Sequence, residues 1–171
     1  MTDIHNIDSN GLFDRMKQLG ITFRNYRHPP LHTVEESQAL RGDLPGGHIK
    51  NLFLRDKKRH FYLLTVSEDR DVDLKWLRRQ MGAQGTLSFG SAEALEGLLG
   101  VRPGAVTPLS VVNDNEGKVA AFLDKSLLEI DPIHAHPLRN DMTLALSGAD
   151  LIRFMSETGH EPQLINFNQQ D

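Results

Sequence analysis

The chain of 171 residues contains no cysteine. This absence excludes disulfide bonds, thiolate nucleophiles and cysteine-ligated zinc, and it is typical of proteins in the reducing cytoplasm. No apolar run approaches the length of a membrane-spanning helix, and the polar start MTDIHNIDSN lacks the features of a signal peptide. We therefore expect a cytoplasmic protein without a membrane segment.

An excess of positive charge is also absent, because 19 Lys and Arg face 23 Asp and Glu for a net charge of −4. A protein that coats nucleic acid is normally basic, so any contact with nucleic acid must be local. The strongest local concentration of cations is RDKKRH, residues 55–60. By charge pattern alone, this segment is a solvated turn between two strands.

The hydrophobic pattern predicts a mixture of short helices and strands. Five helices are expected, over residues 10–19, 33–40, 74–81, 92–99 and 148–158. Asn10 is the expected cap of the first, and Thr33 and Glu36 form a capping box at the start of the second. Ser91 and Ser147 are the expected caps of the last two. Strands are expected over 21–28, 50–54, 61–66, 85–90, 109–113, 117–124, 127–130, 142–146 and 163–167.

Two pairs of these strands read as hairpins, one around residues 55–60 and a second around NDNEG, residues 113–117. Hairpins interspersed with helices predict an α+β or mixed α/β fold, in which helices pack outside a mixed sheet. The length and the lack of a linker or internal repeat predict one domain over residues 1–171.

Several common site types do not fit the sequence. GDLPGGHIKN is no phosphate loop, because Lys50 follows Gly47 too closely and leads into a strand, where the motif needs a helix. His134 and His136 share one side of an extended segment but have no third ligand at diagnostic spacing, so we expect no metal. No serine sits in a nucleophile elbow, so in a hydrolase, water or a substrate hydroxyl must attack.

Three features remain. Lys50 and Asn51 stand at the entrance of a strand, Gly104 and Pro108 bracket a GxxxP loop, and His136 is held extended by Pro137. Glycine lets a backbone approach a ligand closely, and proline fixes the exit of the loop, so free amides can face an oxyanion. Taken singly, each has an ordinary explanation as a surface cation, a turn or an internally bonded histidine.

The order of these segments resembles the bacterial prolyl-tRNA editing family. HPPLHTVEES, GGHIKNLFLRDKK, LSFGSAEALEGLLGVRPGAVTPLSVVND and HPLRNDMTLALSGADLIRFMSETGHEP follow one another as in the YbaK-like superfamily of aminoacyl-tRNA deacylases, with ProX or PrdX as the most similar type. The likeness covers about residues 26–167. It implies a curved mixed sheet surrounded by helices, like the editing domain of prolyl-tRNA synthetase.

The resemblance also implies an activity, which is the hydrolysis in trans of mischarged tRNA(Pro), foremost alanyl-tRNA(Pro). Cysteinyl- or seryl-tRNA as substrate stays open, as do a non-catalytic module that binds tRNA or a synthetase and a regulatory domain for a small molecule. The implied partners are the aminoacylated 3′ end of tRNA and prolyl-tRNA synthetase, with no cofactor and no metal.

The resemblance assigns roles to individual residues. Lys50 and Gly104 are the expected catalytic residues, and they should face each other across a shared cleft. The expected substrate-binding residues are Thr33, Asn51, Ala105, Val106, Thr107, Pro108 and His136. The expected contacts to the tRNA backbone are Arg55, Lys57, Lys58 and Arg59.

Overall fold

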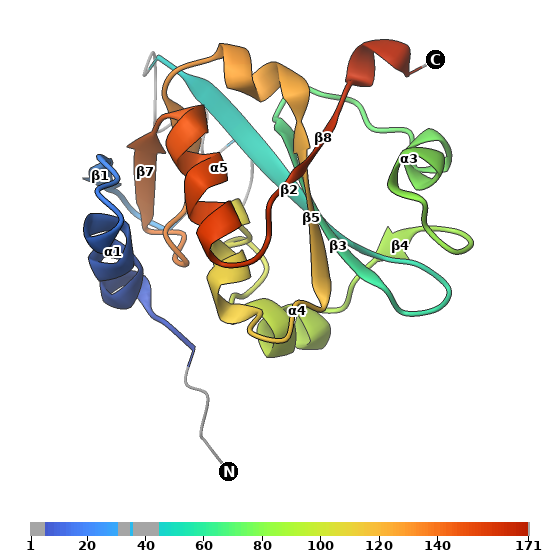
Figure 1. Cartoon of the computed structure of the whole chain (residues 1–171), viewed down its shortest axis with the longest axis horizontal. Helices are drawn as coiled ribbons and strands as arrows, with labels where there is room; N and C mark the ends of the chain where they lie inside the picture. Colours follow the sequence, from blue (N-terminus) through green and yellow to red (C-terminus); the bar gives the residue numbers. More distant parts are fainter. Residues whose placement is uncertain (1–5, 31–34, 36–44, 171) are drawn as a thin grey trace.

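The structure is a computed structural model that describes residues 6–30, 35 and 45–170 (Figure 1). Its α-helices are α1 (Ser9–Gln18), α3 (Leu74–Met81), α4 (Ala92–Leu99) and α5 (Gly148–Glu157), and its short 3-10 helices are η1 (Pro108–Asn113), η2 (Lys125–Glu129) and η3 (Phe167–Gln169). Its strands are β1 (Arg24–Arg27), β2 (Gly47–Arg55), β3 (Phe61–Ser67), β4 (Ser88–Phe89), β5 (Val119–Asp124), β6 (Ile133–Ala135), β7 (Met142–Leu146) and β8 (Gln163–Ile165).

The eight strands form one mixed sheet in the order β1-β7-β6-β2-β3-β5-β8, with β4 paired to β2 beside this path. β2 and β3 form the predicted antiparallel hairpin, whereas β2 with β6, β3 with β5 and β5 with β8 run parallel. Figure 1 shows α1 and α5 toward one end of the sheet and α3 at the other. The predicted class, a mixed sheet with helices packed outside, is confirmed.

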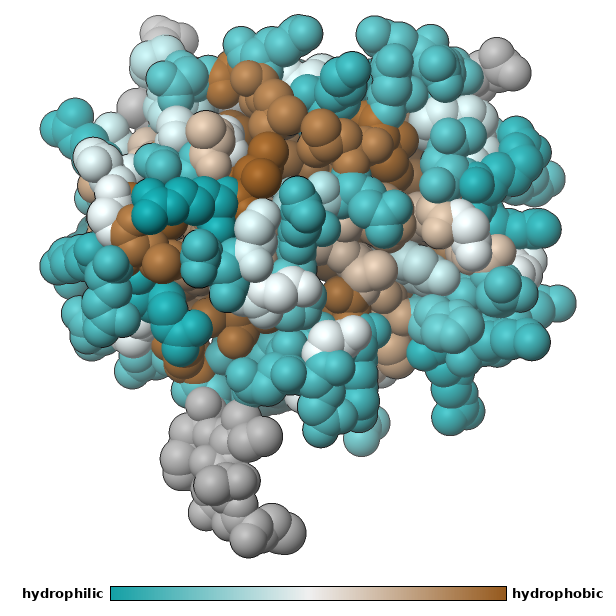
Figure 2. Space-filling model, in the orientation of Figure 1, coloured by the Kyte–Doolittle hydropathy of each residue, from teal (hydrophilic) through white to brown (hydrophobic). Residues whose placement is uncertain are grey.

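Two hydrophobic clusters cover opposite faces of the central hairpin. Leu63 belongs to the larger cluster, which contains residues of α1, α4 and α5, whereas Leu64 belongs to the smaller one, which contains Trp76 and Leu77 of α3. Successive side chains of a strand point to opposite faces, so β3 contributes to both clusters. Some apolar side chains still reach the surface, as the brown areas of Figure 2 show.

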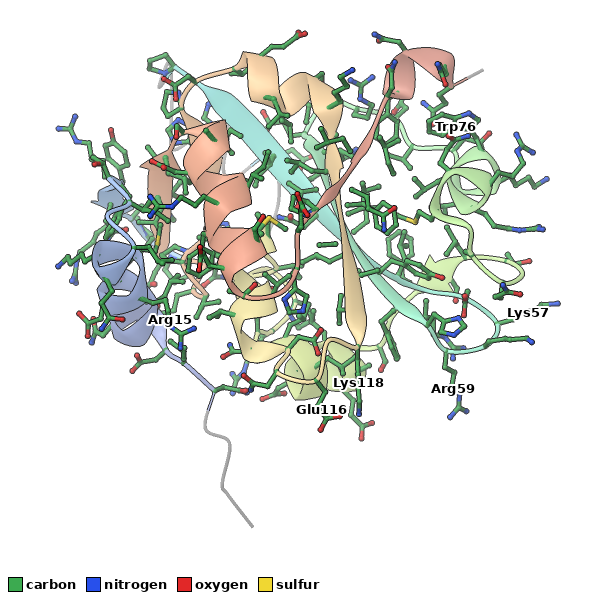
Figure 3. The ribbon with its side chains drawn as sticks, viewed as in Figure 1. Arg15, Lys57, Arg59, Trp76, Glu116 and Lys118 are labelled. Carbon is green, nitrogen blue, oxygen red and sulfur yellow. The ribbon has the colours of Figure 1, made fainter. Side chains whose placement is uncertain are left out.

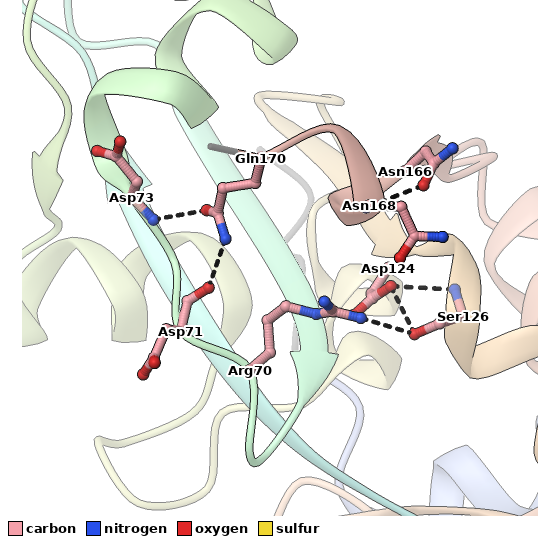
Figure 4. Close-up of polar contacts among 8 residues, drawn as sticks. All are labelled: Arg70, Asp71, Asp73, Asp124, Ser126, Asn166, Asn168 and Gln170. Carbon is pink, nitrogen blue, oxygen red and sulfur yellow. Dashed lines mark hydrogen bonds and ion pairs between the residues drawn. The ribbon is translucent and has the colours of Figure 1, made fainter.

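Polar side chains tie the segments after β3 and β5 together (Figure 4). Arg70 donates to Asp124 at 2.9 Å and to Ser126 at 3.1 Å, and its guanidinium lies 5.0 Å from the centre of the Phe167 ring. Near the end of the chain, the Gln170 amide bonds to the backbone on either side of Val72, at Asp71 and Asp73. These contacts hold the C-terminal segment against the sheet.

The helix ends agree with local sequence signals in most cases. Ser91 and Ser147 cap α4 and α5 as predicted, each accepting from a backbone N–H three residues later. The predicted cap of α1 was wrong. Asp8, not Asn10, accepts from the Gly11 amide, so the helix begins at Ser9.

Two strand predictions were wrong in the second half of the chain, and one strand was missed. Residues 109–113 form η1 because Thr107 caps this segment and Pro108 stands in its first turn, and residues 127–130 fall largely in η2, which Asp124 caps. The second hairpin is therefore absent, and β5 instead pairs parallel to β3. β6 was missed, because three residues are too few to show a period of two.

The helix predicted from Thr33 to residue 40 lies outside the described residues, apart from Glu35. Among the helices of the described residues, none is long and apolar enough to cross a membrane.

Candidate functional site

Lys50 lies in β2, opposite Val66 of β3. Its side chain is partly exposed, and no described residue forms a hydrogen bond or an ion pair with its ammonium group. Since β2 is pleated, Lys50 shares a face with Leu52 and Leu54, whereas Asn51 and Phe53 share the other. The ammonium group is thus uncommitted within the described part of the chain, as a ligand-binding cation must be.

Asn51 connects β2 to the GxxxP loop. Its Nδ2 donates to the carbonyl oxygen of Val106 at 3.0 Å, and its Oδ1 accepts from Thr65 Oγ1 at 2.6 Å. Thr65 is buried in the adjacent strand, so the Asn51 amide is held at both ends. Its two bonds within the protein make it a positioning residue for the loop.

The GxxxP loop, residues 104–108, is fixed by its own backbone. Gly104 has a φ of 92°, a conformation that favours glycine, and the Ala105 amide donates to the carbonyl oxygen of Arg102. Thr107 is fully buried and caps η1, which begins at Pro108. Among the described residues, no acceptor bonds to the backbone N–H of Gly104, Val106 or Thr107. Gly104 and Val106 are at least partly exposed, so their N–H groups are donors that a ligand's carbonyl or oxyanion can use.

The edge of β2 is interrupted in the stretch that contains Lys50 and Asn51. β6 pairs with β2 only at Gly47 and His48, and β4 pairs with it only from Leu54 onward. Residues 49–53 therefore have no strand partner on that edge within the described part of the chain; we call this stretch the β2 gap. At a free edge, side chains from both faces and the loop backbone can reach the same ligand, although Lys50 and Asn51 point to opposite faces.

His136 directly follows β6, the strand that pairs with β2 at Gly47 and His48. Its Nδ1 lies 2.8 Å from the carbonyl oxygen of Met142. Because a carbonyl only accepts, Nδ1 must carry the hydrogen, and in the neutral ring Nε2 is left with a lone pair. Burial lowers the pKa of His136, and this effect outweighs the opposing bond to Met142, so the ring is neutral at pH 7.

A row of rings on the same sheet was not anticipated from the sequence. The rings of His48 and His134 stack at 4.7 Å, Tyr26 lies 6.4 Å from His134, and His28 lies 6.2 Å from His136. His134 is buried, with Nε2 on the Pro45 carbonyl and Nδ1 without a partner among the described residues. The pairing of β1, β2, β6 and β7 creates this row, which no local sequence pattern could reveal.

These histidines do not form a metal site. Within the described ranges, no group of three His, Asp or Glu side chains is placed to hold a metal ion. A separate cavity of about 350 Å³ lies beside His28, and its lining includes Phe13, Arg139 and Asp141 but neither Lys50 nor the GxxxP loop. Thr33, an expected substrate contact, lies outside the described residues.

The basic turn between β2 and β3 is organised by one buried carboxylate. Asp56 is 1% exposed and accepts from the backbone amides of Lys58, His60 and Gln84 and from the side chains of His60 and Tyr62. Burial favours a higher pKa for Asp56, but these bonds outweigh it, and its pKa lies far below the usual value. The charge of Asp56 is thereby directed inward.

The four cations of this turn consequently face solvent. Figure 3 shows Lys57 and Arg59 projecting away from the body of the molecule. Arg55, Lys57, Lys58 and Arg59 are exposed, and none of them forms a salt bridge with a described residue. The turn offers unpaired positive charge at the end of the strand that carries Lys50.

Comparisons with known proteins bear on the family of the chain. The model of the aminoacyl-tRNA editing domain matches residues 28–154. The "Prolyl-tRNA synthetase associated domain-containing protein 1" of Danio rerio is 40% identical over 155 residues, covering 90% of this chain and 84% of that protein. The "Prolyl-tRNA editing protein ProX" of Acetoanaerobium sticklandii is 34% identical over 147 residues, covering 85% and 89%.

The fold has counterparts among solved structures. A crystal structure described as a candidate trans-editing enzyme for prolyl tRNA synthetase superposes with a TM-score of 0.71 at 21% identity and covers 97% of both chains. At this identity the likeness concerns the fold alone. Together with the match over residues 28–154, which contains Lys50, the GxxxP loop and His136, it leads to one conclusion: the chain belongs to the aminoacyl-tRNA editing domain family.

Proposed function

We propose that this protein is a hydrolase that acts in trans on mischarged tRNA(Pro) and releases alanine from alanyl-tRNA(Pro). The observation that carries the proposal is the Asn51–Val106 hydrogen bond. It fixes the GxxxP loop against Asn51 in the β2 gap, and Asn51 is the sequence neighbour of Lys50, whose ammonium group has no partner among the described residues. The names of the relatives refer to prolyl-tRNA synthetase and to prolyl-tRNA editing, and they support tRNA(Pro) as the substrate and prolyl-tRNA synthetase as the partner.

The reaction needs few groups because an ester already has a good leaving group. Water adds to the ester carbonyl, and the carbonyl oxygen becomes an oxyanion that the Lys50 ammonium and the free loop amides stabilise. The bond between the carbonyl carbon and the ribose oxygen then breaks, and the ribose oxygen takes up a proton. The products are free amino acid and tRNA. Neutral His136 lines the amino-acid side and presents the Nε2 lone pair as an acceptor for the substrate amine or the attacking water.

Energetic considerations favour alanine as the amino acid that is removed. A synthetase pocket built for proline cannot reject a smaller amino acid strongly, since each missing methylene is worth only about 1–3 kcal/mol. A second pocket that admits alanine and excludes proline corrects this error by size. Ala135, directly before His136, is one residue whose bulk would set that size.

A deacylation panel tests the proposal. Purified protein is incubated with tRNA(Pro) carrying alanine, cysteine, serine or proline, and the ester remaining is followed over time. We expect rapid loss of alanine, slower loss of the larger side chains and no loss of proline. Preferred release of cysteine or serine would change the assigned amino acid but not the assigned reaction. No release above the spontaneous rate, together with tRNA binding that depends on Lys50, would make the protein a non-catalytic binding module.

A further inference from the structure

Phe89 is the most exposed large apolar side chain of the described residues, with 63% of its surface accessible. It lies in β4, the two-residue strand beside β2 (Figure 1). A single exposed apolar residue is common on protein surfaces. The position of this one relative to Lys50 and the basic turn is what indicates a function.

The backbone around Phe89 is held tightly. Phe89 pairs with Leu54 of β2, and the next amide, of Gly90, donates to the Phe53 carbonyl at 2.9 Å. A Cβ at Gly90 would lie 2.4 Å from the Phe53 ring, so only glycine allows β4 to approach β2 this closely. The ring of Phe89 is therefore presented from a rigid support.

The pairing also decides which way Phe89 faces. Residues directly opposite in an antiparallel pair project to the same face, so Phe89 shares the face of Leu54. Leu54 lies four positions after Lys50, and alternation places both on one face of β2. At about 3.3 Å per residue, Lys50 and Phe89 are about 13 Å apart along the strand.

Cations without a salt-bridge partner among the described residues lie near Phe89 in the pairing, although Arg55, one position after Leu54, projects to the opposite face. Arg55 pairs with Ser88, the neighbour of Phe89, and the Lys57 side chain packs over Gly85 at the start of the same segment. The nearby carboxylate of Asp56 is buried and turned inward. An exposed aromatic ring beside unpaired cations is the combination that binds single-stranded nucleic acid, since the ring stacks on a base and the cations follow the backbone.

We propose that Phe89 stacks on an unpaired base of the tRNA 3′ end, while the terminal adenosine occupies the β2 gap at Lys50. The inference rests on the proposed function and names a further contact to its substrate. A length of 13 Å corresponds to about four stacked nucleotides at ~3.4 Å each, a span that a short single-stranded end covers. The cations of residues 55–59 then lie beside the phosphates that follow.

The test measures binding of a labelled RNA oligonucleotide that ends in CCA, with wild type, Phe89→Ala, Phe89→Trp and the control Leu164→Ala. Leu164 is also apolar and 45% exposed, but it lies in β8 at the other edge of the sheet. We expect Phe89→Ala to weaken binding between about 5-fold and 150-fold, and Leu164→Ala to leave it unchanged. Phe89→Trp should bind at least as well as wild type, and its fluorescence should be quenched by the RNA.

Two outcomes would overturn the inference. One is equal affinity of Phe89→Ala and wild type for the RNA. Phe89 would then be a candidate contact for a protein partner instead. The other is RNA binding by Phe89→Trp without a change in its fluorescence. Both measurements use RNA that carries no amino acid, so they are independent of ester hydrolysis. If the protein hydrolyses no aminoacyl ester but Phe89→Ala still loses RNA affinity, the proposed function fails and the stacking contact stands.

Discussion

Asn51 Nδ2 donates a hydrogen bond of 3.0 Å to the Val106 carbonyl, across 55 positions of sequence. The same side chain accepts from the buried hydroxyl of Thr65. One amide thus ties the strand that carries Lys50 to the GxxxP loop. Loss of this bond should disturb the reaction without removing a group that touches the reacting atoms.

Asn51→Ala should lower both stability and turnover. Thr65 Oγ1 loses its acceptor in a buried position, so we expect the free energy of unfolding to fall by about 1–3 kcal/mol. Freed from β2, residues 104–108 should exchange their amide hydrogens faster, and kcat for alanyl-tRNA(Pro) should fall. Urea denaturation, hydrogen exchange and kinetics measure the three effects. Asn168→Ala, at an exposed position near the C-terminus, is the control. Unchanged kcat with a mobile loop would contradict this role for Asn51.

The pH dependence of deacylation should reflect His136. Its pKa is lowered by burial, so the ring stays neutral as the pH falls from 8 through 6.5, its ordinary value. If the Nε2 lone pair is required, kcat/KM should be constant over this range and fall only at lower pH, where the ring gains a proton. His136→Ala should be slow at every pH and lack this acidic decline. The same decline in His136→Ala would show that another group titrates.

Asp56 should make stability depend on acidic pH. Its folded-state pKa lies far below the ordinary 3.8, because the hydrogen bonds of the turn outweigh burial. Its contribution to stability is therefore complete above pH 4 to 5 and is lost as the pH falls toward the folded pKa. Asp56→Ala should lower the free energy of unfolding at pH 7 by at least about 1–3 kcal/mol, since it leaves buried donors unpaired. It should also flatten the decline of that free energy between pH 5 and pH 2. Urea denaturation of both proteins across this range checks the claim, and parallel declines would refute it.

The basic turn should contribute salt-dependent affinity for tRNA. We expect replacement of Lys57, Lys58 and Arg59 by alanine to weaken tRNA binding at low salt and to reduce the slope of log Kd against log salt by about 0.7–0.9 per lost phosphate contact. Activity on a minimal aminoacyl-adenosine should be unaffected, since that substrate does not reach the turn. Replacement of Arg15 and Lys17 on α1 tests whether any exposed cations have the same effect. An identical slope for the turn variant and wild type would remove the turn from the tRNA interface.

Local signals in the sequence were sufficient for part of the fold. The β2–β3 hairpin, the caps Ser91 and Ser147 and the last helix depend on residues close together in the chain, and they were predicted correctly. The parallel pairing of β3 with β5 and the short β6 depend on contacts between distant segments, which no local period encodes. Strand preference for residues 109–113 was overridden by the cap at Thr107.

The same division applies to the candidate site. Lys50, the GxxxP loop and His136 were selected from the sequence by their order, and the structure places the loop against β2 through Asn51. The unexpected parts are the interrupted edge of β2 and the row of histidine rings, both of which follow from strand register. Phe89 carried no signal in the sequence, because its exposure and its face depend on the pairing of β4 with β2.

The most direct test of the central claim compares wild type, Lys50→Ala and Lys17→Ala in the hydrolysis of alanyl-tRNA(Pro). Lys17 is an exposed lysine of α1 and controls for the loss of one positive charge. Removing one group that stabilises an oxyanion lowers kcat about 10²–10³-fold, so we expect that loss for Lys50→Ala, with the fold and tRNA binding retained, and wild-type activity for Lys17→Ala. Hydrolysis by Lys50→Ala at the wild-type rate would contradict the assignment of the site.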